Sequence, residues 1–378
     1  MGLKVFLIAG EVSGDKLGGA LMRGLKSLTD VEFAGVGGPL MEAEGLSSRF
    51  PMSELSLMGL VEILPKYRAL KARIRETAEA IVAQQPDVLI TIDSPDFCLR
   101  VARLVKEASD IKTIHYVAPT VWAWRSGRAA KMARYIDHVL ALFPFEPALM
   151  TAEGMGCDFV GHPIVAEPVA SPAEAAAYRA SLGLKEDAPL ILALPGSRKG
   201  EVARLSDRFG EALSKVTAHH TDAQIVVPCA APVYDQVRDN TAHWRPNVHL
   251  IAPNDPIKRA AFKAADVALA ASGTVSLELA AAQTPMVIAY DMAWLSRVII
   301  SRMLKVDTVT LVNLVSETRA VPEFIGADCT PDKIATGLLD VLASPNAQND
   351  AMDLTMERLG RGGEYPGLRA AKAVLATL

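Results

Sequence analysis

The sequence contains little cysteine and no cysteine pair. Its four cysteines, Cys98, Cys157, Cys229 and Cys329, are scattered through 378 residues without a CxxC spacing and lie in apolar runs. Structural disulfides and thiolate metal sites both need paired or clustered cysteines. We therefore expect reduced thiols in the core of a cytoplasmic protein.

Long apolar runs, targeting signals and excess positive charge are absent as well. No apolar run approaches the ~20 residues needed to span a bilayer, and the N-terminus lacks the basic-then-apolar layout of a signal peptide. The formal net charge of −4 gives no general attraction to nucleic acid. We expect no nucleic-acid partner, and any affinity for an anionic surface has to come from a local patch.

Metal-binding and dinucleotide-binding fingerprints are also missing. The chain has no DxD pair and no HExxH motif, and its seven histidines are dispersed. We therefore expect no metal and no cofactor. The first glycine loop reads GEVSGD over residues 10–15 rather than GxGxxG, which argues against a dinucleotide-dependent oxidoreductase.

Short apolar runs alternate regularly with segments able to form helices. The expected strands are residues 4–10, 31–36, 87–93, 112–118, 138–143, 158–161, 190–197, 224–228, 247–252, 266–272 and 285–290. This alternation is typical of parallel α/β layers. The length is enough for about two domains, each with its own core.

A proline-rich stretch divides the chain. Residues 163–174, PIVAEPVASPAE, show no periodicity and indicate a linker. We expect an α/β fold of two Rossmann-like domains facing each other across a cleft, where ligands of open α/β sheets bind. The expected parts are an N-terminal domain over 1–165, a C-terminal domain over 166–345, and C-terminal helices over 346–378 that pack back on the first domain.

The segment after residues 266–270 has features of a phosphate site. Ser272 could cap the next helix, Gly273 allows close backbone approach, and Thr274 offers a hydroxyl in the first turn. One turn later, Glu278 could accept two hydrogen bonds from a ribose diol. The alternative is a plain helix cap with no ligand.

A second loop of the same sheet supports the phosphate interpretation. Gly196, Ser197 and Arg198 follow the strand at 190–194, so they reach the same sheet edge. A guanidinium is always charged and bidentate, which suits a leaving diphosphate. The alternative for Arg198 is a solvated surface residue.

The first half offers carboxylates instead of a phosphate loop. In TIDSPDF, Ser94 resembles a helix N-cap, Pro95 the first helical residue and Asp96 a dipole partner. Asp93 stands before that cap, at the carboxyl end of its strand, where it would point into the cleft. It is a candidate general base, or alternatively it orders the loop through backbone hydrogen bonds.

Ten motifs in one order resemble the lipid-A-disaccharide synthases, which are inverting glycosyltransferases of the GT-B type. They are AGEVSGD, GVGGPLMEAEG, LMGLVEIL, IDSPDF, IHYVAPTVWAWR, FPFE, FVGHP, LPGSR, ASGT with the following LE, and LVNL. The resemblance implies transfer of 2,3-diacylglucosamine from its UDP donor to 2,3-diacylglucosamine 1-phosphate. The products would be the β-1,6-linked lipid A disaccharide 1-phosphate and UDP, in lipopolysaccharide biosynthesis. The alternative is a UDP-sugar epimerase of the same architecture.

In this architecture the second domain binds UDP and the first binds the acceptor. Glu11, Ser13 and Asp15 then become candidate sugar ligands, although Asp15 could instead cap the helix that begins near Lys16. Asp93 matches the family's proposed base.

Charge on the departing UDP would be stabilised by Arg198, by the helix N-terminus at Gly273 and Thr274, and by Asn313. Asn313 is polar within an apolar run, and its alternative is a satisfied core amide.

A basic ridge follows two tryptophans, because Arg125, Arg128, Lys131 and Arg134 recur at intervals of three and would share one helix face. Arg125 lies beside Trp122 and Trp124 and is the best-placed residue for the acceptor's 1-phosphate. The alternatives are a solvated ridge and tryptophans that pack the core.

Residues 58–75 combine an apolar patch with cations, the pairing that interfacial segments use. We expect peripheral association with the cytoplasmic face of the inner membrane; the alternative is an ordinary amphipathic helix packed on the first sheet. Pro65 would begin the helix that follows the patch. The family also suggests a homodimer. The expected membrane contacts are Met58, Leu60, Val61, Ile63, Leu64, Lys66 and Arg68.

Overall fold

The computed structural model describes residues 2–55, 60–121, 127–244, 248–292 and 307–378, with only the backbone described for 60–67. The chain divides into two compact units. Unit 1 contains Met1–Ala166 and Gly362–Leu378, and unit 2 contains Glu167–Arg361. Each unit has its own core and is described by itself.

Unit 1 is built on a six-stranded sheet of order β2-β1-β3-β4-β5-β6, with every registered pair parallel. Its strands are β1 (Leu3–Ala9), β2 (Val31–Val36), β3 (Val88–Ile92), β4 (Lys112–Tyr116), β5 (His138–Ala141) and β6 (Gly156–Phe159). The strand β3 is buried along its whole length, as expected when helices cover both faces. The carboxyl ends of β1, β3 and β4 therefore lie at one edge of the sheet.

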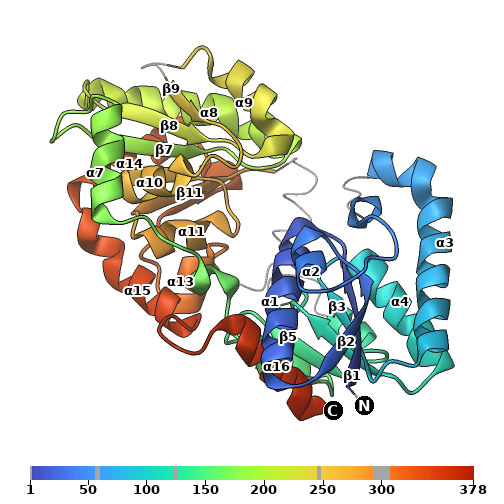
Figure 1. Cartoon of the computed structure of the whole chain (residues 1–378). Coiled ribbons are helices and arrows are strands. Elements are labelled where there is room, and N and C mark those ends of the chain that lie inside the picture. The colour runs from blue at the N-terminus through green and yellow to red at the C-terminus, as the bar shows by residue number, and fades with distance from the viewer. Residues whose placement is uncertain (1, 56–59, 122–126, 245–247, 293–306) are drawn as a thin grey trace. The chain divides into compact units, whose positions relative to one another are not determined.

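Helices cover both faces of this sheet (Figure 1). Phe6 and Ile8 of β1 pack in one apolar cluster with Ile81 and Val101, while α1 and α16 lie against each other over the other face. The helices are α1 (Val12–Leu28), α2 (Pro39–Ala43), η1 (Met52–Glu54), α3 (Leu60–Gln84), α4 (Pro95–Ala108), α5 (Gly127–Met132), α6 (Glu146–Thr151), η2 (Pro163–Ala166) and α16 (Pro366–Thr377).

The C-terminal helix α16 joins unit 1 because small residues let it approach α1 closely. A Cβ atom on Gly24 would lie 2.6 Å from the Gly367 carbonyl oxygen, and one on Gly367 would lie 2.6 Å from the Ala20 carbonyl oxygen. Farther along α16, Arg369 Nη2 donates to the Phe159 carbonyl oxygen at 2.7 Å.

Unit 2 repeats the design with a parallel sheet of order β12-β11-β10-β7-β8-β9. Its strands are β7 (Leu190–Leu194), β8 (Gln224–Pro228), β9 (Val248–Ile251), β10 (Val267–Ala270), β11 (Met286–Tyr290) and β12 (Glu323–Ile325). Its helices are α7 (Pro172–Ser181), α8 (Lys199–His219), η3 (Ala231–Val233), α9 (Tyr234–Thr241), α10 (Ile257–Ala264), α11 (Val275–Ala282), α13 (Leu311–Ser316), η4 (Gly326–Asp328), α14 (Pro331–Ala343), η5 (Pro345–Gln348) and α15 (Asn349–Arg358). The α/β prediction with two parallel sheets is confirmed, while β12 is an additional edge strand that we did not predict.

The division near the C-terminus falls at Gly362 rather than at residue 346. The helix α15 stays with unit 2 because its side chains bond to α13. Thr355 Oγ1 donates to the Val312 carbonyl oxygen at 3.2 Å, and Arg358 Nη1 donates to the Val315 carbonyl oxygen at 2.7 Å.

Candidate functional site

The carboxyl edge of the unit 1 sheet carries strained backbone. Asp93 and Ser94, directly after β3, have φ of +50° and +43°, and Val117, directly after β4, has φ of +83°. Left-handed φ is uncommon for residues with a Cβ atom and is an outlier for a β-branched one. Such strain costs on the order of 1–3 kcal/mol per residue and clusters at functional sites. This edge is therefore the candidate site of unit 1.

The Asp93 side chain is half-buried at this edge. Burial raises the pKa of its carboxyl group, and a hydrogen bond from the Ser94 backbone opposes this only in part. A carboxylate with a raised pKa is a stronger base than a solvated one. Since the Asp93 N–H donates to the Tyr116 carbonyl oxygen at 3.0 Å, the backbone that carries this carboxylate is fixed by the neighbouring strand end.

Ser94 occupies the N-cap position of α4, as predicted, but its hydroxyl makes no cap hydrogen bond. Its Oγ is buried and has no hydrogen-bond partner in the described part of the chain. The left-handed backbone at Ser94 turns the side chain toward Gly10.

Asp15 has a structural role that the sequence did not predict. It lies buried in α1, and its oxygens accept the N–H groups of Gly38, Leu40 and Met41, each at 3.0 Å. It therefore caps the neighbouring helix α2 and not its own helix, so the capping alternative is wrong: the capped segment lies more than 20 residues along the chain. The role of Asp15 as a sugar ligand stays a prediction.

Two other residues of the first loop remain at the surface of unit 1. Glu11 is half-buried at the N-cap position of α1, and Ser13 is exposed. Val12 between them is 78% exposed, which is unusual for an apolar side chain. The assignment of Glu11 and Ser13 as sugar ligands stays a prediction.

The predicted basic ridge is only partly described. Arg125, Trp122 and Trp124 lie outside the described residues. The helix α5 covers only Gly127–Met132, so Arg134 falls beyond its end and the ridge is shorter than predicted.

From Leu60 onward, the candidate membrane segment lies in α3. Met58 lies outside the described residues, and the side chains of Leu60, Val61, Ile63, Leu64 and Lys66 are not described, whereas Arg68 is exposed. Pro65 does not begin the helix as predicted, because α3 already starts at Leu60.

Farther along α3, Ile74 is buried in the core of unit 1, as expected for an amphipathic helix packed on the first sheet. Arg73 has partners within unit 1: it pairs with Glu54 and Glu76, each at 2.9 Å, and its guanidinium carbon lies 4.7 Å from the centre of the Phe50 ring. Not every cation of this segment is therefore free for a membrane.

In unit 2, the loop between β7 and α8 holds Gly196, Ser197 and Arg198 at the carboxyl edge. The Arg198 guanidinium lies 3.1 Å from a carboxylate oxygen of Glu201, and the Arg198 side chain is 69% exposed. The N–H groups of Ser197 and Arg198 donate to the other oxygen of Glu201. Sequence reasoning missed Glu201, although a glutamate at the third position of a helix can accept the N–H of the N-cap residue, which here is Arg198.

The loop between β10 and α11 differs from the prediction in its cap. Thr274, not Ser272, occupies the N-cap position, and no described side chain caps α11. The Ser272 hydroxyl instead donates to the Val309 carbonyl oxygen at 3.4 Å. Gly273 has φ of +151° and open space around it. An uncapped helix N-terminus favours an anion.

Glu278 lies in the first turn of α11 and is already paired. Its Oε2 is 2.7 Å from Lys258 Nζ, with both side chains partly exposed. Lys258 also lies 5.0 Å from the centre of the Phe262 ring. Sequence reasoning missed Lys258, because it lies on α10 and meets Glu278 only in the fold.

Asn313 is a structural amide. It is 1% exposed; its Nδ2 donates to the Val321 carbonyl oxygen at 2.9 Å, and its Oδ1 accepts the Val321 N–H at 3.0 Å. Because both ends of the amide are used within the chain, the predicted catalytic role is not supported and the core-amide alternative holds.

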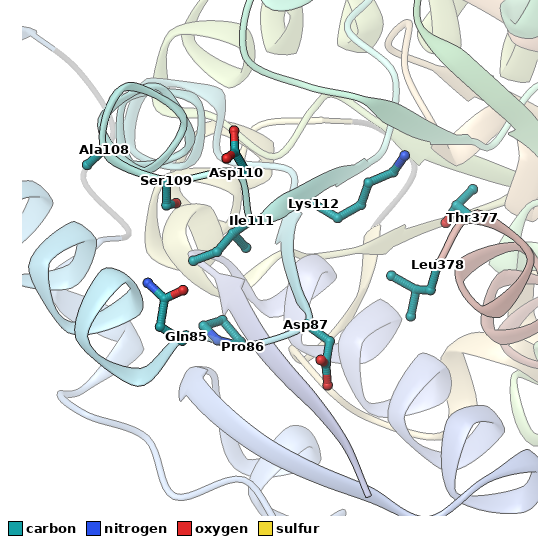
Figure 2. A pocket seen from close by; sticks show the side chains of 10 residues that line it. All are labelled: Gln85, Pro86, Asp87, Ala108, Ser109, Asp110, Ile111, Lys112, Thr377 and Leu378. Carbon is teal, nitrogen blue, oxygen red and sulfur yellow. The ribbon is translucent and has the colours of Figure 1, made fainter. Parts of the chain in front are cut away.

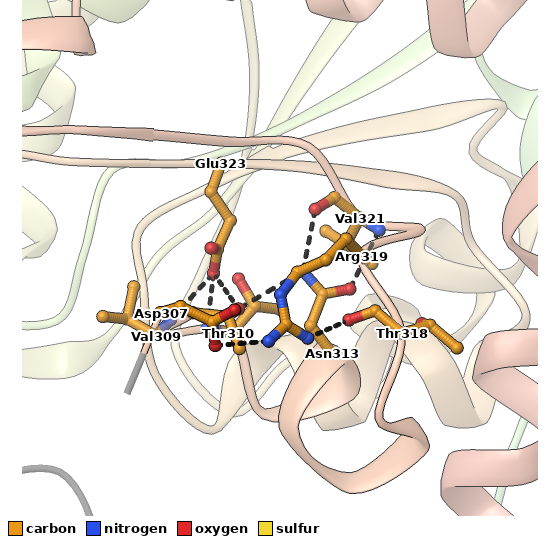
Figure 3. A network of polar contacts seen from close by, with 9 residues as sticks. Asp307, Val309, Thr310, Asn313, Thr318, Arg319, Val321 and Glu323 are labelled. Atoms are coloured by element: carbon orange, nitrogen blue, oxygen red, sulfur yellow. Dashed lines mark hydrogen bonds and ion pairs between the residues drawn. The ribbon is translucent and has the colours of Figure 1, made fainter. Parts of the chain in front are cut away.

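The polar network around Asn313 holds the segment after residue 306 in place (Figure 3). Glu323 Oε1 accepts hydrogen bonds from Thr308 Oγ1 at 2.8 Å, Val309 N at 3.0 Å and Thr310 N at 2.6 Å. Arg319 pairs with Asp307 and lowers the pKa of that carboxyl group. The network therefore fixes the Val309 carbonyl group, whose oxygen accepts the hydrogen bond from the Ser272 hydroxyl.

A pocket of about 670 Å³ lies elsewhere, at the amino ends of β3 and β4 (Figure 2). It is lined by residues that precede these strands, by Lys112 at the start of β4, and by Thr377 and Leu378. Ligands of open α/β sheets bind at the opposite edge. This pocket is therefore separate from the candidate site.

No group of three His, Cys, Asp or Glu side chains among the described residues is arranged to hold a metal ion. None of the helices placed by the structure combines the length and apolar character that crossing a membrane requires.

The fold is shared with enzymes of two kinds. The structure of a UDP-GlcNAc 2-epimerase from Neisseria meningitidis, bound to UDP-GlcNAc, has a TM-score of 0.62 and 12% identity, over 99% of this chain and 98% of that one. A calicheamicin glycosyltransferase has a TM-score of 0.57 and 16% identity, over 100% of this chain and 98% of that one. At such identities the likeness shows the fold alone.

Sequence relationships are much more specific. A lipid-A-disaccharide synthase from Ruegeria pomeroyi is 64% identical over 384 aligned residues, which cover 100% of this chain and 96% of the relative. The family model described as lipid-A-disaccharide synthetase matches residues 5–373. The chain therefore belongs to the lipid-A-disaccharide synthetase family of glycosyltransferases.

Proposed function

We propose that this chain transfers 2,3-diacylglucosamine from its UDP donor to 2,3-diacylglucosamine 1-phosphate, with inversion, and releases UDP. The observation that carries the proposal is the 64% identity to a lipid-A-disaccharide synthase over the whole chain. The epimerases share only the fold, at 12% identity in the case of the Neisseria meningitidis enzyme. The transferase is therefore favoured over the epimerase.

Asp93 is proposed as the general base of unit 1. Inverting transfer needs a group that removes the proton from the attacking acceptor hydroxyl as the bond to the sugar forms. The raised pKa of Asp93 and its fixed, strained backbone suit that role. Glu11 and Ser13, at the tip that follows β1, are proposed to bind sugar hydroxyls of the acceptor, and Arg125 its 1-phosphate.

UDP is proposed to bind at the carboxyl edge of the unit 2 sheet. The exposed guanidinium of Arg198 and the uncapped N-terminus of α11 at Gly273 supply positive charge. These groups would stabilise negative charge as the diphosphate departs. The turn at Gly196 and Ser197 is also proposed to bind UDP, as are Ser272 and Thr274. Glu278 is proposed to bind the ribose.

Because both proposed substrates carry acyl chains, the enzyme is proposed to work at the cytoplasmic face of the inner membrane, docked through the start of α3. The enzyme is proposed to work without a metal ion or other cofactor and to form a homodimer.

The decisive experiment is incubation with UDP-2,3-diacylglucosamine, with and without the monosaccharide 1-phosphate, while UDP and disaccharide are measured. We expect both products only when the acceptor is present, and we expect EDTA to leave the rate unchanged. Conversion of the donor sugar into an epimer without acceptor would favour the epimerase instead. Loss of activity with EDTA and recovery with magnesium would overturn the metal-free assignment.

A further inference from the structure

The loop that carries Arg198 is built around the carboxylate of Glu201. Gly196 adopts φ of +120°, and a Cβ atom there would lie 2.6 Å from Glu201 Cβ and 2.7 Å from Glu201 Oε2. Only a glycine leaves this space. The turn and the carboxylate are therefore one structural unit.

Both oxygens of Glu201 are used by this loop and by β11. Oε2 accepts the Ser197 N–H at 3.1 Å and the Arg198 N–H at 3.3 Å. Oε1 lies 3.1 Å from Arg198 Nη1 and 3.5 Å from the Tyr290 hydroxyl, which donates to it. The carboxylate thus connects the backbone of the loop, the guanidinium and the neighbouring strand.

The side chains of Glu201 and Arg198 differ in how far they are exposed to solvent. The Glu201 side chain is 13% exposed, whereas that of Arg198 is 69% exposed. A guanidinium has five N–H donors in a fixed plane, and Glu201 accepts from one of its nitrogens, Nη1. Glu201 is therefore placed as an internal support, and most of the guanidinium stays available to an anion.

We propose that Glu201 is the positioning residue of Arg198: it holds the guanidinium in the orientation that binds the diphosphate of the donor. The inference rests on the proposed function, in which Arg198 binds that diphosphate. Holding a long side chain in its binding geometry before the ligand arrives reduces the entropy lost on binding. Glu201 itself touches no substrate in this assignment.

Two other roles for Glu201 predict different results. A carboxylate that only caps α8 would affect stability and not UDP affinity. A carboxylate that competes with the diphosphate for Arg198 would weaken UDP binding, so its removal would strengthen binding.

Unit 2 offers a matched control for the capping role. On α7, Glu174 Oε2 accepts the Ser171 N–H at 2.8 Å, and Ser171 Oγ accepts the Glu174 N–H at 3.2 Å. This capping box has the same spacing as Arg198 and Glu201. Glu174→Gln therefore weakens a cap in the same unit without touching the proposed site.

The experiment measures UDP affinity by calorimetry for the full chain and for the variants Arg198→Ala, Glu201→Gln, Glu174→Gln and the double variant at 198 and 201. Thermal unfolding shows that each is folded at the temperature used. We expect Arg198→Ala to weaken binding about 10- to 100-fold, the range of one charged hydrogen-bonded contact. Glu201→Gln should weaken it about 3- to 10-fold, the double variant should match Arg198→Ala, and Glu174→Gln should bind normally.

Three results would overturn the positioning role: unchanged or tighter UDP binding by Glu201→Gln, additive losses in the double variant, or an equal loss in Glu174→Gln. If the unsubstituted chain fails to bind UDP, or Arg198→Ala binds it normally, the proposed UDP site fails instead. The two failures are therefore distinguishable.

Discussion

Gly10 and Ser94 are in such close contact that a Cβ atom on Gly10 would lie 2.4 Å from the Ser94 hydroxyl oxygen and 2.8 Å from Ser94 Cβ. Gly10 follows β1 and Ser94 follows the adjacent strand β3. The absence of a side chain at Gly10 therefore decides where the backbone of Ser94, and with it Asp93, can lie.

Gly10→Ala should displace Ser94 and lower turnover at least tenfold, because the added methyl group overlaps the serine. Overpacking of this kind costs about 1–3 kcal/mol of unfolding free energy. Urea unfolding and steady-state turnover measure the two effects. Gly127→Ala is the control, since Gly127 is exposed at the start of α5 and has open space around it. Normal turnover by Gly10→Ala would show that the position of Ser94 is unimportant for catalysis.

Asp93→Asn should lower turnover about 100-fold or more, the range expected when a general base is lost. UDP binding should be unchanged, because the proposed UDP site lies in unit 2. Turnover at saturating donor and acceptor and UDP calorimetry measure the two quantities. Normal turnover would remove Asp93 from the mechanism.

The pKa of Asp93 also fixes the direction of two pH effects. Because burial raises this pKa above 3.8, activity should fall with decreasing pH at a higher pH than an ordinary aspartate would give. The folded state holds the proton more tightly than the unfolded state, so ionisation of Asp93 destabilises the fold as pH rises above 3.8. Asp93→Asn removes that cost and should be at least as stable as the unsubstituted chain at neutral pH.

Most strands were predictable from the sequence, because apolar runs are bounded by polar residues such as Asp93. Their carboxyl ends were predicted less well: β7 ends at Leu194 and β10 at Ala270, before the expected residues 197 and 272. The edge strand β12 was missed, since only three residues, Glu323–Ile325, follow a proline there. Sequence patterns also could not decide whether Asn313 acts in catalysis or is a satisfied core amide. Its partner Val321 lies eight residues away, and only the folded loop shows that both amide atoms are used.

Tertiary partners account for the other differences. Asp15 is close in sequence to the loop that we propose to face the sugar, but it bonds to backbone groups of α2 and its N-cap that lie 23 to 26 residues away. Lys258 and Glu278 are 20 residues apart and meet because α10 and α11 pack together. Single-sequence patterns report local capping and periodicity and contain no direct information on such pairs.

Asp15→Asn should destabilise unit 1. The asparagine amide can accept with one oxygen only, so at least one of the three N–H groups of α2 loses its acceptor, at a cost of about 1–3 kcal/mol. Urea unfolding measures this loss, and UDP affinity should be unchanged. Ser13→Ala, at the exposed surface of the same helix, should leave stability unchanged. If Asp15→Asn unfolds normally yet loses turnover, Asp15 acts on substrate after all.

Membrane docking through the start of α3 is the most direct test of the proposed location. The cations that follow the apolar patch include Arg68, Lys71 and Arg75, which are exposed. Near an anionic leaflet each cation contributes about 1 kcal/mol, so binding should be reversible and weakened by salt. The apolar part of the patch would supply the rest of the affinity by burying Val61 and Leu64 at the headgroup boundary.

Co-sedimentation with anionic liposomes at low and high salt measures this binding. Val61→Ser plus Leu64→Ser should reduce the bound fraction tenfold or more, because each loses about 1.5–3 kcal/mol of apolar burial. Ala69→Ser plus Ala72→Ser is the matched control, since both alanines are exposed on the same helix. If the unsubstituted chain stays in the supernatant at low salt, or the first double variant binds equally well, the docking surface does not lie at the start of α3. Binding that resists high salt would show that apolar insertion, rather than attraction between the cations and the anionic lipids, provides most of the affinity.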